Sequence, residues 1–127
     1  MKTLHISSVL LLFIFMTNCS LFKSKELKKA ETKMNFSFSK IDKNGLIKKR
    51  GTSLSYEFCI PNKTEYIDEI HRIDESIGTY KSSKGRIGCG ANEILCIGET
   101  ADKDYKKILI ALTNLNYVKQ INESFFE

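Results

Sequence analysis

The sequence predicts an α+β domain over residues 52–127, and three observations indicate this class. Two segments carry apolar residues at helical spacing. The segments that flank them show either the strict alternation of a half-buried strand or a short, continuous apolar run. Turn-forming glycine, serine and asparagine residues separate these segments. The chain length leaves room for one domain with one modest core.

The first strand and helix are predicted from residues 54–60 and 66–77. Apolar and polar side chains alternate over the first range, and Pro61 stops the strand. Asn62 lies three residues before Glu65, which is the spacing of a capping box, so a helix is expected to begin there. Apolar residues then recur at helical spacing, with acidic and basic residues on the other face.

The second half of the domain repeats this alternation of strand and helix. Residues 79–81 form a short strand candidate, and residues 94–97 form a nearly continuous apolar run typical of a buried strand. Thr100 and Asp102 offer N-terminal caps to a second amphipathic helix. Residues 117–121 are the last predicted strand.

The predicted order is strand, helix, strand, strand, helix, strand. This is the order of a ferredoxin-like βαββαβ sandwich, in which two helices cover one face of a four-stranded antiparallel sheet. Such a sheet makes the first and third strands antiparallel neighbours. The fold serves enzymes, carriers and binding modules alike, so function must be argued from particular residues.

Two segments precede the domain. Residues 19–33 are rich in lysine, serine and glutamate and predict a flexible basic tether. Residues 34–51 predict a candidate β-hairpin, because Phe36, Phe38 and Ile41 alternate before the turn-forming stretch Asp42–Gly45. This hairpin is either an N-terminal extension of the domain or a loosely held arm.

Positive charge is concentrated before the domain. Residues 23–50 hold ten lysines and arginines against three acidic residues, whereas residues 51–127 hold nine against twelve. A nucleic-acid partner is not expected, because such binders carry their basic surface on the folded domain. A basic tether contacts anionic lipid head groups or serves as a solvated spacer.

Residues 1–18 have the layout of a signal peptide. Lys2 is followed by the apolar run Ile6–Met16, which is too short for a membrane-spanning helix. The stretch that closes on Cys19 resembles the lipobox of bacterial lipoproteins, although Met16 and Asn18 depart from its commonest residues. The alternative is an ordinary secretory signal that releases a soluble protein.

The lipoprotein resemblance implies a covalent fate for Cys19. The amide before it would be cleaved, its sulfur acylated with chains such as palmitate, and the protein held to a membrane of the cell envelope. Ser20 stands where many inner-membrane lipoproteins carry aspartate, so an outer-membrane location is favoured if the organism has one.

Three further cysteines lie in the domain, namely Cys59, Cys89 and Cys96. In an exported protein the default for cysteines is a disulfide. Cys59 with Cys89 is the favoured pair, because antiparallel first and third strands bring the end of one to the beginning of the other. Cys89 with Cys96 is the next choice. The spacings do not match a zinc motif, so no metal is expected.

The glycine-rich stretch before the third strand is a candidate ligand loop or a sharp turn. Its glycines are in the wrong order for a dinucleotide fingerprint and lead into a strand, so phosphate cradling of that kind is excluded. Backbone amides that glycine leaves accessible could still meet an anion, but a turn is favoured. The loop residues are Lys84, Gly85, Arg86, Gly88 and Gly90.

No nucleophile–base pair stands out in the sequence, so no catalytic residues and no cofactor are assigned. The leading hypothesis is a membrane-anchored envelope lipoprotein that acts as a non-enzymatic binding or interaction module, with an unidentified protein or ligand as partner. The alternative is a cysteine-based redox or metal-handling protein of the cell envelope.

Overall fold

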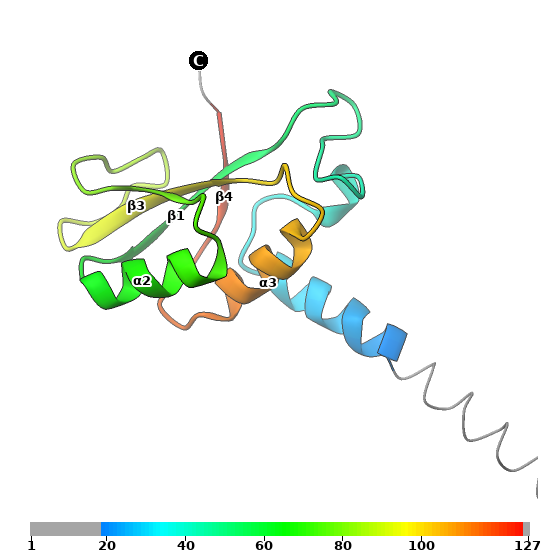
Figure 1. Cartoon of the computed structure of the whole chain (residues 1–127), viewed down its shortest axis with the longest axis horizontal. Helices are drawn as coiled ribbons and strands as arrows, with labels where there is room; N and C mark the ends of the chain where they lie inside the picture. Colours follow the sequence, from blue (N-terminus) through cyan, green and yellow to red (C-terminus); the bar gives the residue numbers. More distant parts are fainter. Residues whose placement is uncertain (1–18, 126–127) are drawn as a thin grey trace, which may run out of the picture.

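The computed structural model describes residues 19–125, so the predicted signal peptide lies outside the described part (Figure 1). It is an α+β fold with one four-stranded antiparallel sheet, in the strand order β2-β3-β1-β4. A helix over residues 19–31 and the 3₁₀ turn η1 (Phe38–Lys40) come first. The domain follows with β1 (Ser55–Pro61), α2 (Thr64–Ile73), β2 (Gly78–Tyr80), β3 (Glu93–Glu99), α3 (Tyr105–Asn114) and β4 (Asn122–Ser124).

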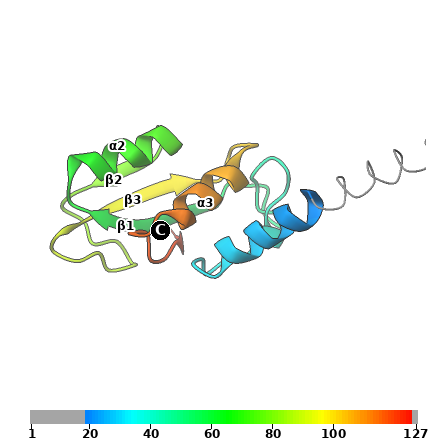
Figure 2. The ribbon, with the colours of Figure 1, turned by 90° about the horizontal axis from the view of Figure 1, so that it is seen from below.

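The core lies between one face of the sheet and two helices. Both α2 and α3 cover the same face (Figures 1 and 2). Alternate residues of β1, namely Tyr56, Phe58 and Ile60, belong to the main core cluster, which also includes side chains of α2 and α3. Phe58 pairs with Cys96 of β3 and Ile60 pairs with Ile94. The alternation predicted for the first strand is therefore confirmed.

The ends of α2 differ from the prediction. The capping box is wrong, because the helix begins at Thr64 with Lys63 as its N-cap and without a side-chain cap hydrogen bond. The backbone N–H of Asn62 instead bonds the carbonyl oxygen of Asn92 at 2.9 Å, which ties the end of β1 to the beginning of β3. The helix ends at Ile73, and the buried Ile77 lies in the link to β2.

The last strand is displaced along the chain. The prediction placed it at residues 117–121, but β4 spans Asn122–Ser124 and pairs with β1. Ile121 forms an isolated parallel bridge with Met34 instead. The segment before the domain therefore contacts the chain directly before β4.

The predicted flexible tether is wrong for most of its length. Residues 19–31 are helical, and Ala30 is only 3% exposed. After the helix, Lys33 donates from Nζ to the carbonyl oxygens of Leu115 and Val118, at 3.1 and 2.7 Å, just beyond the end of α3. This lysine therefore ties the N-terminal segment to the chain that follows α3. No helix within residues 19–125 is long and apolar enough to cross a membrane.

The predicted turn at Asp42–Gly45 is confirmed, and it is not a loose arm. The backbone N–H of Asp42 bonds the carbonyl oxygen of Leu46 at 2.8 Å, and its side chain accepts the N–H of Leu46 at 3.0 Å. Ile41 forms an antiparallel bridge with Ile47, although neither belongs to a regular strand. Three apolar residues of this segment are buried, namely Phe36, Phe38 and Ile41.

Thr100 joins this turn to the sheet, which explains why it does not cap α3 as predicted. Its buried hydroxyl accepts the N–H of Leu54 at 2.9 Å and donates to the carbonyl oxygen of Gly45 at 2.6 Å. Gly45 has a φ of +81°, and a Cβ there would overlap the backbone carbonyl of Thr100. Helix α3 accordingly begins five residues later, at Tyr105.

We predict that Gly45→Ala destabilises the domain far more than Gly51→Ala. Both glycines have positive φ, but a Cβ on Gly51 (φ +67°) meets nothing within 4 Å. The left-handed backbone alone costs about 1 kcal/mol for alanine. The collision at Gly45 should raise the loss to about 3 kcal/mol or more. Urea unfolding of both variants measures the difference, and equal losses would contradict the close approach of Thr100.

Candidate functional site

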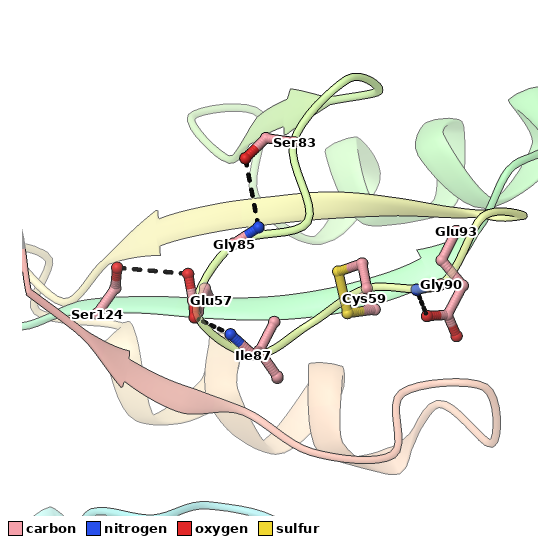
Figure 3. Close-up of a disulfide and its surroundings, with 9 residues drawn as sticks. Glu57, Cys59, Ser83, Gly85, Ile87, Gly90, Glu93 and Ser124 are labelled. Atoms are coloured by element: carbon pink, nitrogen blue, oxygen red, sulfur yellow. Dashed lines mark hydrogen bonds between the residues drawn. A yellow bond between two sulfur atoms is a disulfide. The ribbon is translucent and has the colours of Figure 1, made fainter.

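The face of the sheet away from the helices is covered by the glycine-rich loop. Residues 81–92 leave β2, cross this face and return to β3 (Figure 3). Cys59 of β1 and Cys89 of the loop form a disulfide. The favoured pairing is thereby confirmed, and it closes a span of 30 residues. By analogy with native disulfides of small domains, it contributes about 2 to 4 kcal/mol to stability.

A buried carboxylate provides the second attachment of the loop. Glu57 is only 2% exposed. Its Oε1 accepts the backbone N–H of Ile87 at 2.5 Å, and its Oε2 lies 3.5 Å from the hydroxyl of Ser124 on β4 (Figure 3). A buried acidic group needs such donors, because an unpaired one is costly. Glu57 therefore links β1, β4 and the loop.

Gly85 brings the loop close to the sheet. It has a φ of +62°, and a Cβ there would lie 2.6 Å from Leu95 Cδ1 and 2.9 Å from Glu57 Oε2. The positive φ and the lack of space for a Cβ both exclude a larger residue at this position. This glycine therefore permits close packing and a turn, which is the interpretation that the sequence favoured.

The loop amides that an anion would need already have acceptors within the protein. Gly85 donates to Ser83 Oγ at 3.3 Å, Gly90 donates to Glu93 Oε2 at 2.7 Å, and Gly88 and Cys89 both donate to the carbonyl oxygen of Lys84. Lys84 and Arg86 are exposed. This arrangement favours a structural turn over an anion site.

The thiol chemistry of the domain is limited by burial and by the disulfide. Cys59, Cys89 and Glu93 place three potential ligand atoms within 4.8 Å of one another, but both sulfurs are joined in the disulfide. Cys96 is fully buried, and burial raises the pKa of its thiol from 9.0 to about 12. A neutral, enclosed thiol is a poor nucleophile. Cys19 is exposed.

A basic pocket that the sequence did not predict lies where β1 begins. Its volume is about 500 Å³. It is bounded by η1, by the turn after Ile47, by Leu54 and by the chain that follows β4. The residues that line it are Ser39, Lys40, Ile47, Lys48, Lys49, Arg50, Leu54, Glu123 and Phe125.

The lining of this pocket joins cationic and apolar groups. Four basic side chains oppose the single acidic group of Glu123, and Ile47, Leu54 and Phe125 supply apolar surface. Pockets of this volume are typical of small-molecule sites. The basic run Lys48–Arg50 is visible in the sequence, but nothing in the sequence around it indicates a pocket. What sequence reasoning missed is that the turn folds back toward the end of β4.

Comparison with known proteins adds no relative to this description. No family model matches the chain, and no curated protein or solved structure matches it either.

We predict that the chain from Cys19 onward, produced without lipid and oxidised in air, has two thiols of very different reactivity. Cys19 should react at once with a disulfide reagent because it is exposed. Cys96 should react only on unfolding, because it is buried and its pKa lies near 12. Titration with Ellman's reagent, with and without guanidinium chloride, measures both. Further reactive thiols in the native protein would indicate an open Cys59–Cys89 pair and support thiol chemistry.

Proposed function

We propose that this protein is a lipid-anchored binding module of the bacterial cell envelope, with the basic pocket as its ligand site. The ligand class is a small organic anion that has an apolar body. We also propose a ferredoxin-like sandwich for the domain. The element order from β1 to β4, the strand order β2-β3-β1-β4 and the location of α2 and α3 on one face support this assignment.

The proposed anchor rests on the sequence before Cys19 and on the exposure of this residue. An acylated cysteine must be accessible at the end of the mature chain, and Cys19 is exposed. The core and sheet of the described chain lie between residues 27 and 125. An outer-membrane location remains the favoured address for an organism that has such a membrane.

The observation that carries the ligand proposal is the mixed lining of the pocket. Cationic side chains favour an anionic group, and the effect is strongest at low salt. The apolar surface of Ile47, Leu54 and Phe125 favours a hydrocarbon or aromatic part of the same molecule. A ligand with both features uses both kinds of group, whereas a simple inorganic ion uses only the charges.

The thiol-based alternative is less well supported. A redox or metal role needs at least one accessible thiolate, but Cys59 and Cys89 are paired and Cys96 is enclosed. Reduction by a dithiol protein would be required before Cys59, Cys89 and Glu93 could meet a metal ion together. The binding module needs no such step.

We predict that Cys19→Ser releases the protein from membranes without unfolding the domain. The wild-type chain, expressed in a bacterial host, should incorporate a labelled fatty acid and partition into the detergent phase. Cys96→Ala is the matched control, because it removes a cysteine from the core and should retain the label. If Cys19→Ser remains in the detergent phase after signal removal, the anchor lies elsewhere.

We predict that the anionic dye 8-anilinonaphthalene-1-sulfonate binds the pocket of the folded chain from residue 19 onward. The double variant Lys49→Glu/Arg50→Glu should weaken binding about tenfold at low salt, equal to about 1.4 kcal/mol. Phe125→Ser should weaken it as well, since it removes apolar surface. Fluorescence titration measures these affinities.

The control for charge is Lys63→Glu/Lys81→Glu, which alters net charge equally at exposed sites outside the pocket lining. It should leave the dye affinity within about twofold of the wild type. Equal weakening by both double variants would show a general charge effect and would contradict the pocket as the ligand site.

A further inference from the structure

The most exposed large apolar side chains of the described chain are neighbours. Leu21 and Phe22 are 68% and 65% exposed. The other two of this kind within residues 19–125, Tyr80 and Phe125, are each 48% exposed and lie elsewhere. Two adjacent apolar residues left in solvent at the same helix end indicate a surface that meets a partner. They stand two and three positions after Cys19.

The N-terminal helix, residues 19–31, has one side toward the domain and another away from it. Leu27 and Ala30 pack against the core and share a face, because residues three apart are neighbours on a helix. Leu21, Lys25 and Lys28 follow one another at spacings of four and three, so they also share a face. At 100° per residue this second face lies opposite the first.

The outward face therefore combines apolar and cationic groups. Phe22 and Lys29 flank it, and each of its members is exposed: Leu21, Phe22, Lys25, Lys28 and Lys29. Lysines beside exposed leucine and phenylalanine are typical of helices that lie in the interface of a bilayer. An anionic surface attracts lysines that lie within a Debye length of it.

The helix is joined to the domain through defined contacts. Glu31 Oε1 accepts the hydroxyl of Ser37 at 2.7 Å and the backbone N–H of Phe38 at 2.8 Å. Ala30 is buried, and Lys33 is bonded to carbonyl oxygens that follow α3. The helix lies beside the domain, and its N-terminal end points away from it (Figures 1 and 2). Whatever binds the outward face therefore also orients the domain.

We infer that the outward face of residues 19–31 binds the surface of an anionic lipid bilayer, with Leu21 and Phe22 in the interface. This inference adds a head-group preference and a fixed orientation to the proposed anchor. It rests on the proposed membrane location, but its interactions do not require the acyl chains. The acyl anchor at Cys19 and membrane binding by the helix can thus be tested separately.

The test uses the chain from residue 19 onward with Cys19→Ser, so that no lipid is attached. Cosedimentation is measured with vesicles of phosphatidylglycerol mixed with phosphatidylcholine and with vesicles of phosphatidylcholine alone. Binding is expected for the mixed vesicles and should be much weaker for the zwitterionic ones. The triple variant Lys25→Glu/Lys28→Glu/Lys29→Glu should lower partitioning roughly a hundredfold. Leu21→Ser/Phe22→Ser should lower it about tenfold.

Two controls match these changes. Lys63→Glu/Lys81→Glu/Lys119→Glu alters the net charge equally at exposed positions outside the helix, and Tyr80→Ser removes an exposed apolar side chain that lies outside both the helix and the pocket. Both should bind mixed vesicles within about threefold of the parent chain. Circular dichroism confirms that every variant is folded.

The outcomes separate this inference from the proposed anchor. Equal binding to both vesicle types, or equal losses in the helix variants and their controls, would overturn it. Absence of vesicle binding by the unlipidated parent, together with fatty-acid labelling at Cys19 in cells, would overturn it while the anchor stands. Vesicle binding without fatty-acid labelling at Cys19 would support membrane binding by the helix and would contradict the proposed lipid anchor.

Discussion

The central strand β1 is the constraint on which the rest of the structure depends. Its neighbours on the two sides are β3 and β4, and alternate side chains serve opposite faces. Tyr56, Phe58 and Ile60 fill the core under the helices, whereas Glu57 and Cys59 hold the glycine-rich loop on the other face. A slip of one residue would exchange these two sets. It would place a carboxylate in the core and leave the loop without either attachment, so the register of β1 is strongly specified.

Periodicity and pairing geometry were enough to predict the main parts of this arrangement. The alternation around Phe58 and the apolar run around Cys96 identified the two strands that form the longest ladder. Antiparallel pairing of those strands then predicted the Cys59–Cys89 disulfide, because the end of one strand meets the beginning of the other. Local patterns predict elements well when their own side chains form the core. The α+β class of the fold follows from the same periodicity of apolar residues.

The remaining features depend on contacts between distant parts of the chain. Residues 19–33 are rich in lysine and serine and have too little apolar surface to predict an ordered segment. Their helix is nevertheless held to the domain by the buried Ala30 and by the hydrogen bonds of Glu31. Lys33, after the helix, bonds carbonyl oxygens more than 80 residues away. Thr100 has the residue type of a helix cap, but its hydroxyl instead joins Leu54 to Gly45. The basic pocket was missed for the same reason, because Phe125 and Arg50 meet only in the folded protein.

The basic residues of 23–50 are divided between two surfaces of the folded protein. Part of it lies on the outward face of the N-terminal helix, and part lines the pocket beside Leu54. With a flexible tether, the orientation of the pocket would be independent of the anchor. A helix of residues 19–31 extends about 20 Å and is fixed to the domain at its end. If the proposed anchor at Cys19 holds, this helix sets the distance and direction of the basic pocket from the lipid surface, which a flexible tether would leave free.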